Sequence, residues 1–432
     1  MNFVIYSIFQ VVIVSFFYIL KKTKYLPLFI SLTSIYLLFQ KFDIYLIGYK
    51  GVHIVSDSVS FYFILANIIC TVIVSIQLTR FHNLNTNFFV SLTHIILNFL
   101  FISNDLFNIY VLLETLTLLI VLLILSGEKF EYKLTGLKYI FASTVAMNIY
   151  LIGVGIHYYK TGTFDIQNLS GISELLMKSA LISKAGIFLF GLWLPEVYSD
   201  SEVEVSALLS SVYTQSVLFP LIRIGIGKDF YFLGIITFFF GAIFALLSKD
   251  LKKLLAYSSM SQLGLMLLNP VIAPLYVLIH GVSKSILFLS TRYIERNLDK
   301  ERTFSIFLFL AVFISFFSQS GISFTLGGYL KEQIISSKML SVIFSFVTSL
   351  YAGKVFSRNI YYSKDHFLLF LFSLILIYPF FVDFISLFVV LTGMFVGKVV
   401  FSKVNIEFRF STEIILTFMI FSISIFSLFG VI

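Results

Sequence analysis

Long apolar stretches follow one another along almost the entire chain, and they limit it to a membrane-embedded fold. Residues 2–20, for instance, contain no charged side chain. A helix needs about 20 mostly apolar residues to cross the hydrocarbon core of a bilayer. Only 12% of the 432 residues are charged, whereas soluble domains average about 25%. We therefore predict a single polytopic membrane domain over residues 1–432.

The apolar runs are continuous rather than alternating, which predicts an all-α integral membrane protein. We expect about 14 transmembrane helices from the number of such runs. Gly321, Gly327 and Gly328 interrupt one of them, and Pro379 and Asp383 could break another into a re-entrant segment. The expected spans lie near residues 2–20, 25–40, 58–78, 87–103, 105–126, 137–158, 174–193, 204–225, 229–247, 254–272, 273–294, 303–330, 331–356, 366–400 and 413–432.

Basic residues are concentrated in the loops after odd-numbered spans, which predicts the orientation in a cell membrane. Positive loops face the cytoplasm, so we expect the N-terminus outside. The loop after the seventh span is acidic, but acidic residues weigh little in this rule. The net charge of +8 reflects these loops and anionic lipid rather than nucleic acid. The basic residues in the loops after odd-numbered spans are Lys21, Lys22, Lys24, Arg80, Lys129, Lys133, Lys138, Lys249, Lys252, Lys253, Arg296, Lys300 and Arg302.

A few ionisable residues lie inside the spans, where a charge costs about 2.5–3.5 kcal/mol even on the lenient insertion scale. Glu114 lies nine residues into the fifth span and Lys184 lies centrally in the seventh. His280 and Lys284 are one turn apart in the eleventh, and therefore share a face. Lys331 follows in the twelfth or thirteenth region. Such a series of titratable groups, each in a different span, is the chemistry that a proton relay needs.

Simpler interpretations exist for each residue. Glu114 and Lys184 could form a structural ion pair, and His280 could be a satisfied interior histidine. Lys338 could extend its ammonium group to the membrane interface, and His94 is more typical of packing than of a relay. If one helix is continuous there, Lys331 and Lys338 lie two turns apart.

Six short motifs follow one another between about residues 50 and 335, and together they resemble a known family. The family comprises the antiporter-like subunits of respiratory complex I, of Mrp-type Na+/H+ antiporters (their D-type subunit) and of membrane-bound hydrogenases. The motifs are Asp105–Glu114 (DLFNIYVLLE); Lys138-Tyr139 with Tyr150–Gly153 and Thr161–Thr163; Lys184 followed by Trp193-Leu194-Pro195-Glu196; Val205–Leu209 (VSALL); Asp250–Ser259 followed by Ser261–Gly264; and His280-x3-Lys284-x2-Leu287-Phe288-Leu289.

The resemblance implies two inverted five-helix repeats, each with one broken helix, and a polar axis at mid-membrane. It implies that Glu114 and Lys184 form one end of that axis, and that His280, Lys284 and Lys331 continue it. It also implies a non-catalytic subunit without a redox centre or cofactor. Such a subunit moves H+, and possibly Na+, with energy supplied by other membrane subunits of the complex.

The chain departs from the family pattern at particular places. Gln215 lies where the family usually has a central lysine, and a glutamine cannot carry a proton itself. The prolines that usually break the seventh and twelfth spans are absent, although Gly186, Gly191 and Gly321 lie nearby. The C-terminal helices, 336–432, show no specific resemblance.

Three functions remain open at this point. The leading hypothesis is an ion-translocating subunit of a respiratory, hydrogenase or Mrp-type complex. The alternatives are a structural or anchoring subunit that has lost transport, as Gln215 suggests, and a membrane subunit of an inorganic-carbon uptake system. A catalytic site or a metal site is not expected, because the sequence contains no nucleophile–base arrangement and no cluster of metal ligands.

Overall fold

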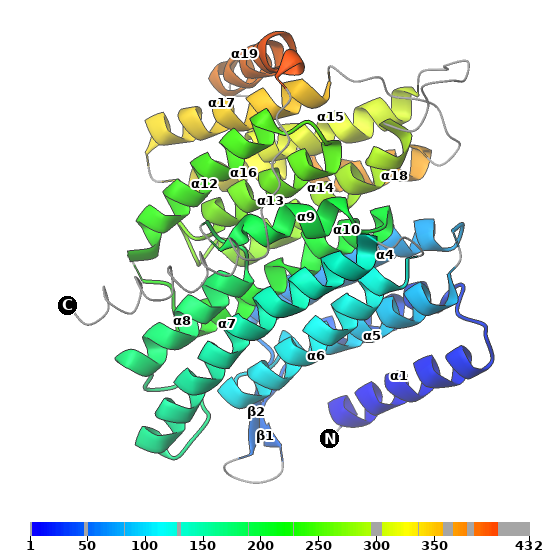
Figure 1. Cartoon of the computed structure of the whole chain (residues 1–432), viewed down its shortest axis with the longest axis vertical. Coiled ribbons are helices and arrows are strands. Elements are labelled where there is room, and N and C mark those ends of the chain that lie inside the picture. Colours follow the sequence, from blue (N-terminus) through cyan, green and yellow to red (C-terminus); the bar gives the residue numbers. More distant parts are fainter. Residues whose placement is uncertain are drawn as a thin grey trace.

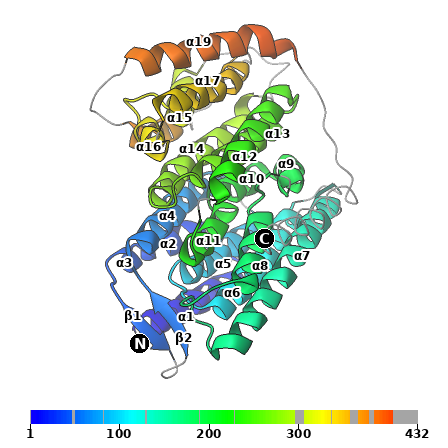
Figure 2. The same ribbon diagram turned by 90° about the vertical axis from the view of Figure 1, so that its left-hand side faces the viewer.

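The protein is a stack of helices that lie side by side with similar tilt (Figure 1). A computed structural model describes residues 2–46, 51–81, 83–127, 131–188, 190–227, 229–294, 305–335, 337–356, 366–377 and 384–404. The N-terminal helices lie at one end of the stack and α17 and α19 at the other (Figures 1 and 2). The predicted all-α membrane architecture is confirmed.

The first half of the chain forms helices whose starts are fixed by polar side chains. Asp57, Asn83 and Asp105 each accept a hydrogen bond from a backbone N–H in the first turn of α4, α5 and α6, respectively. Such caps satisfy N–H groups that have no partner within the helix. The helices are α1 (Asn2–Ile19), α2 (Leu26–Thr33), α3 (Ile35–Leu38), α4 (Ser58–Leu78), α5 (Leu84–Leu100), α6 (Leu106–Leu125) and α7 (Glu131–Thr161).

The middle of the chain contains short and irregular helices. In this part, α8 (Ile172–Lys184) is followed by a 3-10 turn (Gly191–Trp193) and α9 (Leu194–Ser199). Next, α10 (Val203–Leu208) continues through a π-helical stretch (Leu209–Tyr213) and a 3-10 turn (Gln215–Val217) into α11 (Leu218–Ile224).

The second half repeats the pattern of long helices around a broken one. It comprises α12 (Asp229–Leu247), α13 (Leu251–Met266), α14 (Ala273–Ile294), α15 (Ile306–Ser320), α16 (Leu326–Ile334), α17 (Lys338–Val355), α18 (His366–Ser373), a 3-10 turn (Leu374–Leu376), α19 (Phe384–Val400) and a last 3-10 turn (Phe401–Lys403).

Two helices are broken at glycines rather than at prolines. The backbone takes φ +72° at Gly186, after α8, and φ +96° at Gly321, after α15. This left-handed conformation is accessible to glycine without the penalty paid by other residues. The broken helices that the family resemblance implied are therefore present in the described residues, with glycine doing what proline does elsewhere.

Two details of the predicted spans need correction. The boundary expected at residues 330/331 falls inside α16, and α16 ends at Ile334 before α17 starts at Lys338. Lys331 and Lys338 therefore do not share a continuous helix, because the chain leaves helical geometry between them. The stretch 413–432 and the residues Pro379 and Asp383 lie outside the described residues.

Burial separates interior helices from peripheral ones. In α14 and in the stretch Val203–Ile224, 94% of the most apolar 18-residue window is buried, against 44% in α6, α7 and α12. In the described part, six helices are long and apolar enough to cross a membrane, and several shorter apolar helices accompany them; a total of about 14 stays a prediction. Because α14 is enclosed by protein, it can carry polar side chains without exposing them to lipid.

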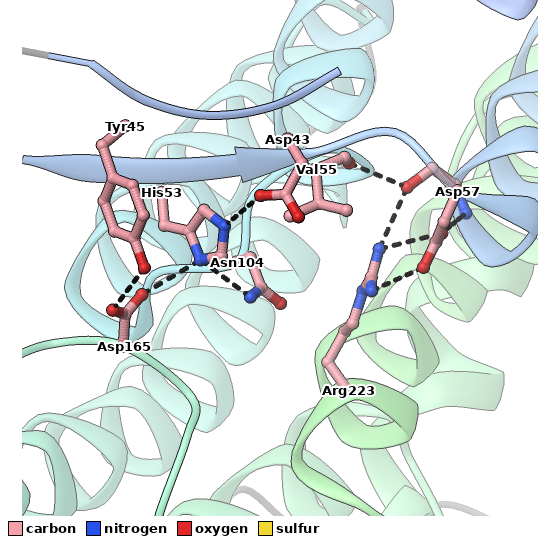
Figure 3. A network of polar contacts seen from close by, with 9 residues as sticks. Asp43, Tyr45, His53, Val55, Asp57, Asn104, Asp165 and Arg223 are labelled. Atoms are coloured by element: carbon pink, nitrogen blue, oxygen red, sulfur yellow. Dashed lines mark hydrogen bonds and ion pairs between the residues drawn. The ribbon is translucent and has the colours of Figure 1, made fainter. Parts of the chain in front are cut away.

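A small β-hairpin, which the sequence did not predict, packs beside the start of α6. Strand β1 (Asp43–Leu46) pairs antiparallel with β2 (Val52–Val55). His53 holds the hairpin in place: its Nε2 lies 2.7 Å from Asp43 Oδ1 and its Nδ1 lies 3.0 Å from Asp165 Oδ1. Tyr45 stacks on the same imidazole and donates to Asp165 (Figure 3).

Asp57 joins two distant parts of the chain next to this hairpin. Its carboxylate accepts from the backbone N–H of Ser60, which caps α4, and forms a bidentate ion pair with Arg223 at the end of α11, with distances of 2.7 and 3.0 Å (Figure 3). The two elements are 166 residues apart in sequence. One side chain thus starts a helix and ties the two halves of the domain together.

We predict that Asp57→Ala destabilises the protein more than Asp250→Ala does. Asp250 only caps α13, by accepting from Lys253 N, and loss of a cap costs about 1 kcal/mol. Asp57→Ala removes a cap and also leaves the half-buried Arg223 without its carboxylate. The apparent melting temperature in detergent should fall for both variants and further for Asp57→Ala. Equal decreases would show that the Arg223 pair adds nothing to stability.

Candidate functional site

Lys184 lies at the end of α8, two residues before the break at Gly186. Its side chain is 5% exposed. Its Nζ donates to Thr117 Oγ1 of α6 at 2.6 Å and also to Ser143 Oγ of α7. The two hydroxyls are themselves hydrogen-bonded, 2.9 Å apart. Three helices therefore converge on one buried amine.

Glu114 lies one turn before Thr117 on α6 and interacts electrostatically with Lys184. Among the described residues, however, no ion pair joins Glu114 to Lys184, whose ammonium group is bound by hydroxyls instead. Glu114 Oε1 is buried and has no hydrogen-bond partner in this part of the chain. Glu114 and Lys184 thus interact electrostatically, but the ammonium group binds Thr117 and Ser143 and not the carboxylate, which disfavours the simple structural ion pair.

His280 and Lys284 lie on the interior helix α14. They are one turn apart and share a face, as expected. Lys284 is completely buried, and its Nζ donates to Leu255 O at 2.9 Å and to Ser258 Oγ, both on α13. The His280 ring is 1% exposed, and neither ring nitrogen has a hydrogen-bond partner among the described residues. His280 is therefore not the satisfied interior histidine of the simpler interpretation.

A chain of neutral polar side chains continues from His280 toward α17. The His280 ring lies nearly parallel to Tyr276, with centroids 6.4 Å apart. Tyr276 Oη donates to Gln262 Oε1 at 2.7 Å, and Gln262 Nε2 donates to Tyr351 Oη at 3.0 Å. These links connect α14, α13 and α17.

Lys331 lies on α16, the helix that follows the break at Gly321, and is completely buried. Its Nζ donates to Thr348 Oγ1 at 3.0 Å, and to Gln319 O and Phe344 O at 3.3 Å. Gln319 O belongs to the last turn of α15, whose carbonyls lose their helical partners at the break. The break thus supplies an acceptor for the lysine. Thr348 is one turn from Tyr351 on α17, which brings Lys331 to the end of the polar chain.

Gln215 lies where the π-helical stretch meets a 3-10 turn, between the two halves. Its Nε2 donates to Ser210 O at 2.9 Å, while its Oε1 is buried without a partner among the described residues. Ser210 Oγ is hydrogen-bonded to Ser259 Oγ of α13 at 2.8 Å. Ser259 is the neighbour of Ser258, which binds Lys284, so Gln215 is adjacent to the second lysine site. A single-turn π segment is common at functional sites.

Several further polar groups along these interior helices are buried without a partner in the described part of the chain. Buried polar groups are normally hydrogen-bonded, and ordered water supplies the partner when protein does not. Each of these groups is therefore a position at which a water molecule can supply the missing partner. These groups are the hydroxyls of Ser183, Ser318 and Ser320 and the amide of Gln319.

Sequence reasoning found the charged residues of this site but not the groups that hold them. Hydroxyl side chains are frequent in all the spans, so the sequence does not mark the particular ones that line this site. These residues are Thr117, Ser143, Tyr276, Tyr351 and Thr348. Only Ser258, Ser259 and Gln262 lay within a quoted motif.

Two residues outside the site agree with their simpler interpretations. Lys338 is exposed at the start of α17. His94 is buried and hydrogen-bonded to Thr71 and Ser34, as a packing residue should be.

In the described ranges, no group of three or more His, Cys, Asp and Glu residues could hold a metal ion.

Comparisons with known proteins place this geometry in a family. Residues 103–357 match the family model described as "NADH:quinone oxidoreductase/Mrp antiporter, TM". NADH-quinone oxidoreductase subunit N of Desulforudis audaxviator is 32% identical over 218 residues, which cover 43% of this chain and 43% of that protein. The match thus spans less than half the length of this relative.

Two solved structures share the fold at low sequence identity. One is the structure of an archaeal membrane-bound sulfane sulfur reductase, with a TM-score of 0.76, 17% identity and coverage of 96% of this chain and 98% of the other. The Mrp complex of Dietzia sp. has a TM-score of 0.66, 18% identity and coverage of 94% and 81%. Because the family model covers more than half of the chain, this protein belongs to the NADH:quinone oxidoreductase/Mrp antiporter transmembrane family.

Proposed function

We propose that the chain is an ion-translocating subunit of a larger membrane complex, and that it passes protons along the line Glu114, Lys184, Gln215, Lys284, His280 and Lys331. One observation carries the proposal. Three lysines are buried in the interior, and their amines are held by hydroxyl and carbonyl oxygens rather than by carboxylates.

A lysine held in this way is suited to exchange a proton. An ammonium group inside a membrane protein is costly unless a counter-charge or ligand accompanies it. Hydroxyl oxygens can accept a hydrogen bond from the ammonium form and can donate one to the neutral amine. The surroundings of Lys184 therefore serve both protonation states, which a fixed ion pair would not.

The helix breaks support the same interpretation. Discontinuous helices at mid-membrane carry the ion and substrate sites of many transporters, because the break exposes backbone groups and allows one half to move. Lys184 precedes one break by two residues and Lys331 follows the other, so each lies where such a movement would change its surroundings.

The gap between Lys184 and Lys284 contains Gln215, which cannot bind a proton. Its amide can still orient water, because Oε1 is free to accept and Ser210 fixes the other end. The alternative, an anchoring subunit that has lost transport, rests on this residue. An inorganic-carbon uptake system has no comparable observation in its favour.

The setting of the subunit follows from the same family membership. One of the two similar structures is an archaeal respiratory membrane complex and the other is an Mrp complex, so we propose that this chain assembles with other membrane subunits, which supply the energy. We further propose a cell-membrane location with the N-terminus outside, an antiporter-like core at residues 50–335, and H+ as the coupled ion. The buried lysines would repel Na+, so any Na+ exchange would use another route.

We expect Glu114→Gln and Lys184→Ala to abolish proton movement. The chain, purified with its associated subunits, is reconstituted in liposomes, and a potassium diffusion potential drives proton uptake that an internal pH dye reports. The rate should fall about 100-fold, the lower end of what a positioned proton-transfer group contributes. Unchanged rates in both variants would contradict transport through this line and favour the anchoring role.

Lys331→Ala and Lys354→Ala provide a matched pair of buried lysines. Lys354 is 2% exposed and donates to Leu246 O, Ser248 O and Val404 O, none of which belongs to the polar line. Lys331→Ala should stop proton uptake in the same assay, whereas Lys354→Ala should lower the melting temperature and leave the rate per folded molecule near wild type. If both variants lost transport equally, the effect would reflect general damage to buried lysine sites.

A further inference from the structure

The acidic loop, residues 196–204, runs from α9 into the first turn of α10 and carries four carboxylates, at residues 196, 200, 202 and 204, on a side that is otherwise basic. Two of them point into the protein: Glu196 is 6% exposed and Glu204 is 2% exposed. Each meets a cation from a distant helix, Lys138 of α7 for Glu196 and Arg292 of α14 for Glu204. The acidic loop is therefore buried against basic side chains, which explains why it departs from the charge pattern of the other loops.

The two ion pairs differ in what they can do. The Arg292 guanidinium donates to Glu204 at 2.9 Å and lies over the ring of Phe81, 3.8 Å from its centroid. Arginine does not lose its proton in proteins, so this pair is a fixed contact. Glu196 and Lys138 both carry groups that can exchange a proton, and their pair lies at the first turn of α9, the short helix that follows the break at Gly186.

Polar groups lead inward from Glu196 to the Lys184 site. Trp193, three residues earlier, has a buried Nε1–H with no partner among the described residues and packs edge-to-face on Tyr139, with centroids 5.3 Å apart. Tyr139 follows Lys138 on α7 and lies one turn before Ser143, which binds Lys184. The side chain of Tyr139 interacts with Thr117 and, electrostatically, with Glu114. The rise from residue 138 to residue 143 is about 7.5 Å along the helix.

We propose that the Glu196–Lys138 pair is the port through which Lys184 exchanges protons with the aqueous phase at the side where α6 ends. This inference rests on the proposed function. A proton from water binds the Glu196 carboxylate and then passes by way of Tyr139 and water to the Lys184 amine. Glu196 returns to its ionised form, and Lys138 balances its charge throughout. Tyr139 relays the proton in this scheme, and Trp193 is a positioning residue.

Other charged and titratable groups lie around Glu196. On α13, Tyr257 interacts electrostatically with Glu196, and Lys252 donates to Ser201 O at 2.6 Å. On α10, Glu204 is bound to Arg292. Ser199 donates to Asp200 at 2.7 Å. Of the carboxylates at residues 196–204, Glu196 is the one that lies on the same short segment as Trp193, which packs on Tyr139 on the side of Lys184.

The decisive variant is Glu196→Gln, assayed by potential-driven proton uptake in liposomes that contain the chain with its associated subunits. Uptake at neutral pH should fall about tenfold, because the amide cannot bind the incoming proton. Acidifying the compartment on the Glu196 side should restore much of the rate, and Glu196→Asp should retain most of it. Recovery by acid is the result that a merely structural role would not produce, because a structural ion pair would not be rebuilt by protons.

Two matched carboxylates serve as controls. Glu204→Gln removes the other buried acid of the same loop. Glu174→Gln removes an acid paired with Lys178 near the opposite end of α8. Both should conduct close to the wild-type rate, and melting temperatures of all variants should confirm folding.

The outcomes separate this inference from the proposed function. If Glu114→Gln is inactive but Glu196→Gln conducts normally, the port lies elsewhere and the proposed function stands. If Glu196→Gln is inactive and neither acid nor Glu196→Asp restores uptake, the pair is structural and the inference is wrong. If the wild-type protein and Glu114→Gln behave alike, the proposed function itself is wrong.

Discussion

The structure depends on how three lysine amines are accommodated deep inside a helical membrane protein. Lys184, Lys284 and Lys331 are each enclosed by side chains from at least one other helix, and each binds hydroxyl or carbonyl oxygens. These oxygens satisfy the donors of the ammonium form, which lowers the cost of burying it. In the described residues, no carboxylate is hydrogen-bonded to any of the three amines. The amines are therefore held firmly in position while their protonation remains free to change.

The irregular parts of the fold are the parts that make this possible. The break at Gly321 frees carbonyls at the end of α15, and Lys331 uses one of them. The break at Gly186 separates Lys184 on α8 from Glu196 on α9, so a movement of the short helix would change the distance between this acid and the buried lysine. The π-helical stretch at Leu209–Tyr213 is a third irregular segment, and it lies just before Gln215. Regular helices form the peripheral layers, and the interruptions cluster along the polar line.

Much of the fold could be predicted from the sequence, because apolar runs of sufficient length specify spans directly. The charged members of the site were also visible, since ionisable residues are rare in such runs. Their partners were not, because Thr117 and Ser143 look like any other hydroxyl residue until α6 and α7 are packed against α8. The boundary at Lys331 was misplaced for a similar reason: glycine tolerates both a continuous helix and a break, and only packing decides between them. The hairpin at Asp43–Val55 was missed because its two strands are only four residues long.

The central claim is that the buried lysines belong to one hydrated line and not to separate structural sites. An experimental structure of the protein in its assembled complex, at a resolution that reveals water, tests this most directly. The account predicts ordered water between Glu114, Lys184, Gln215 and Lys284, bound to the polar atoms that have no protein partner. A dry gap at Gln215, closed by apolar side chains, would contradict it.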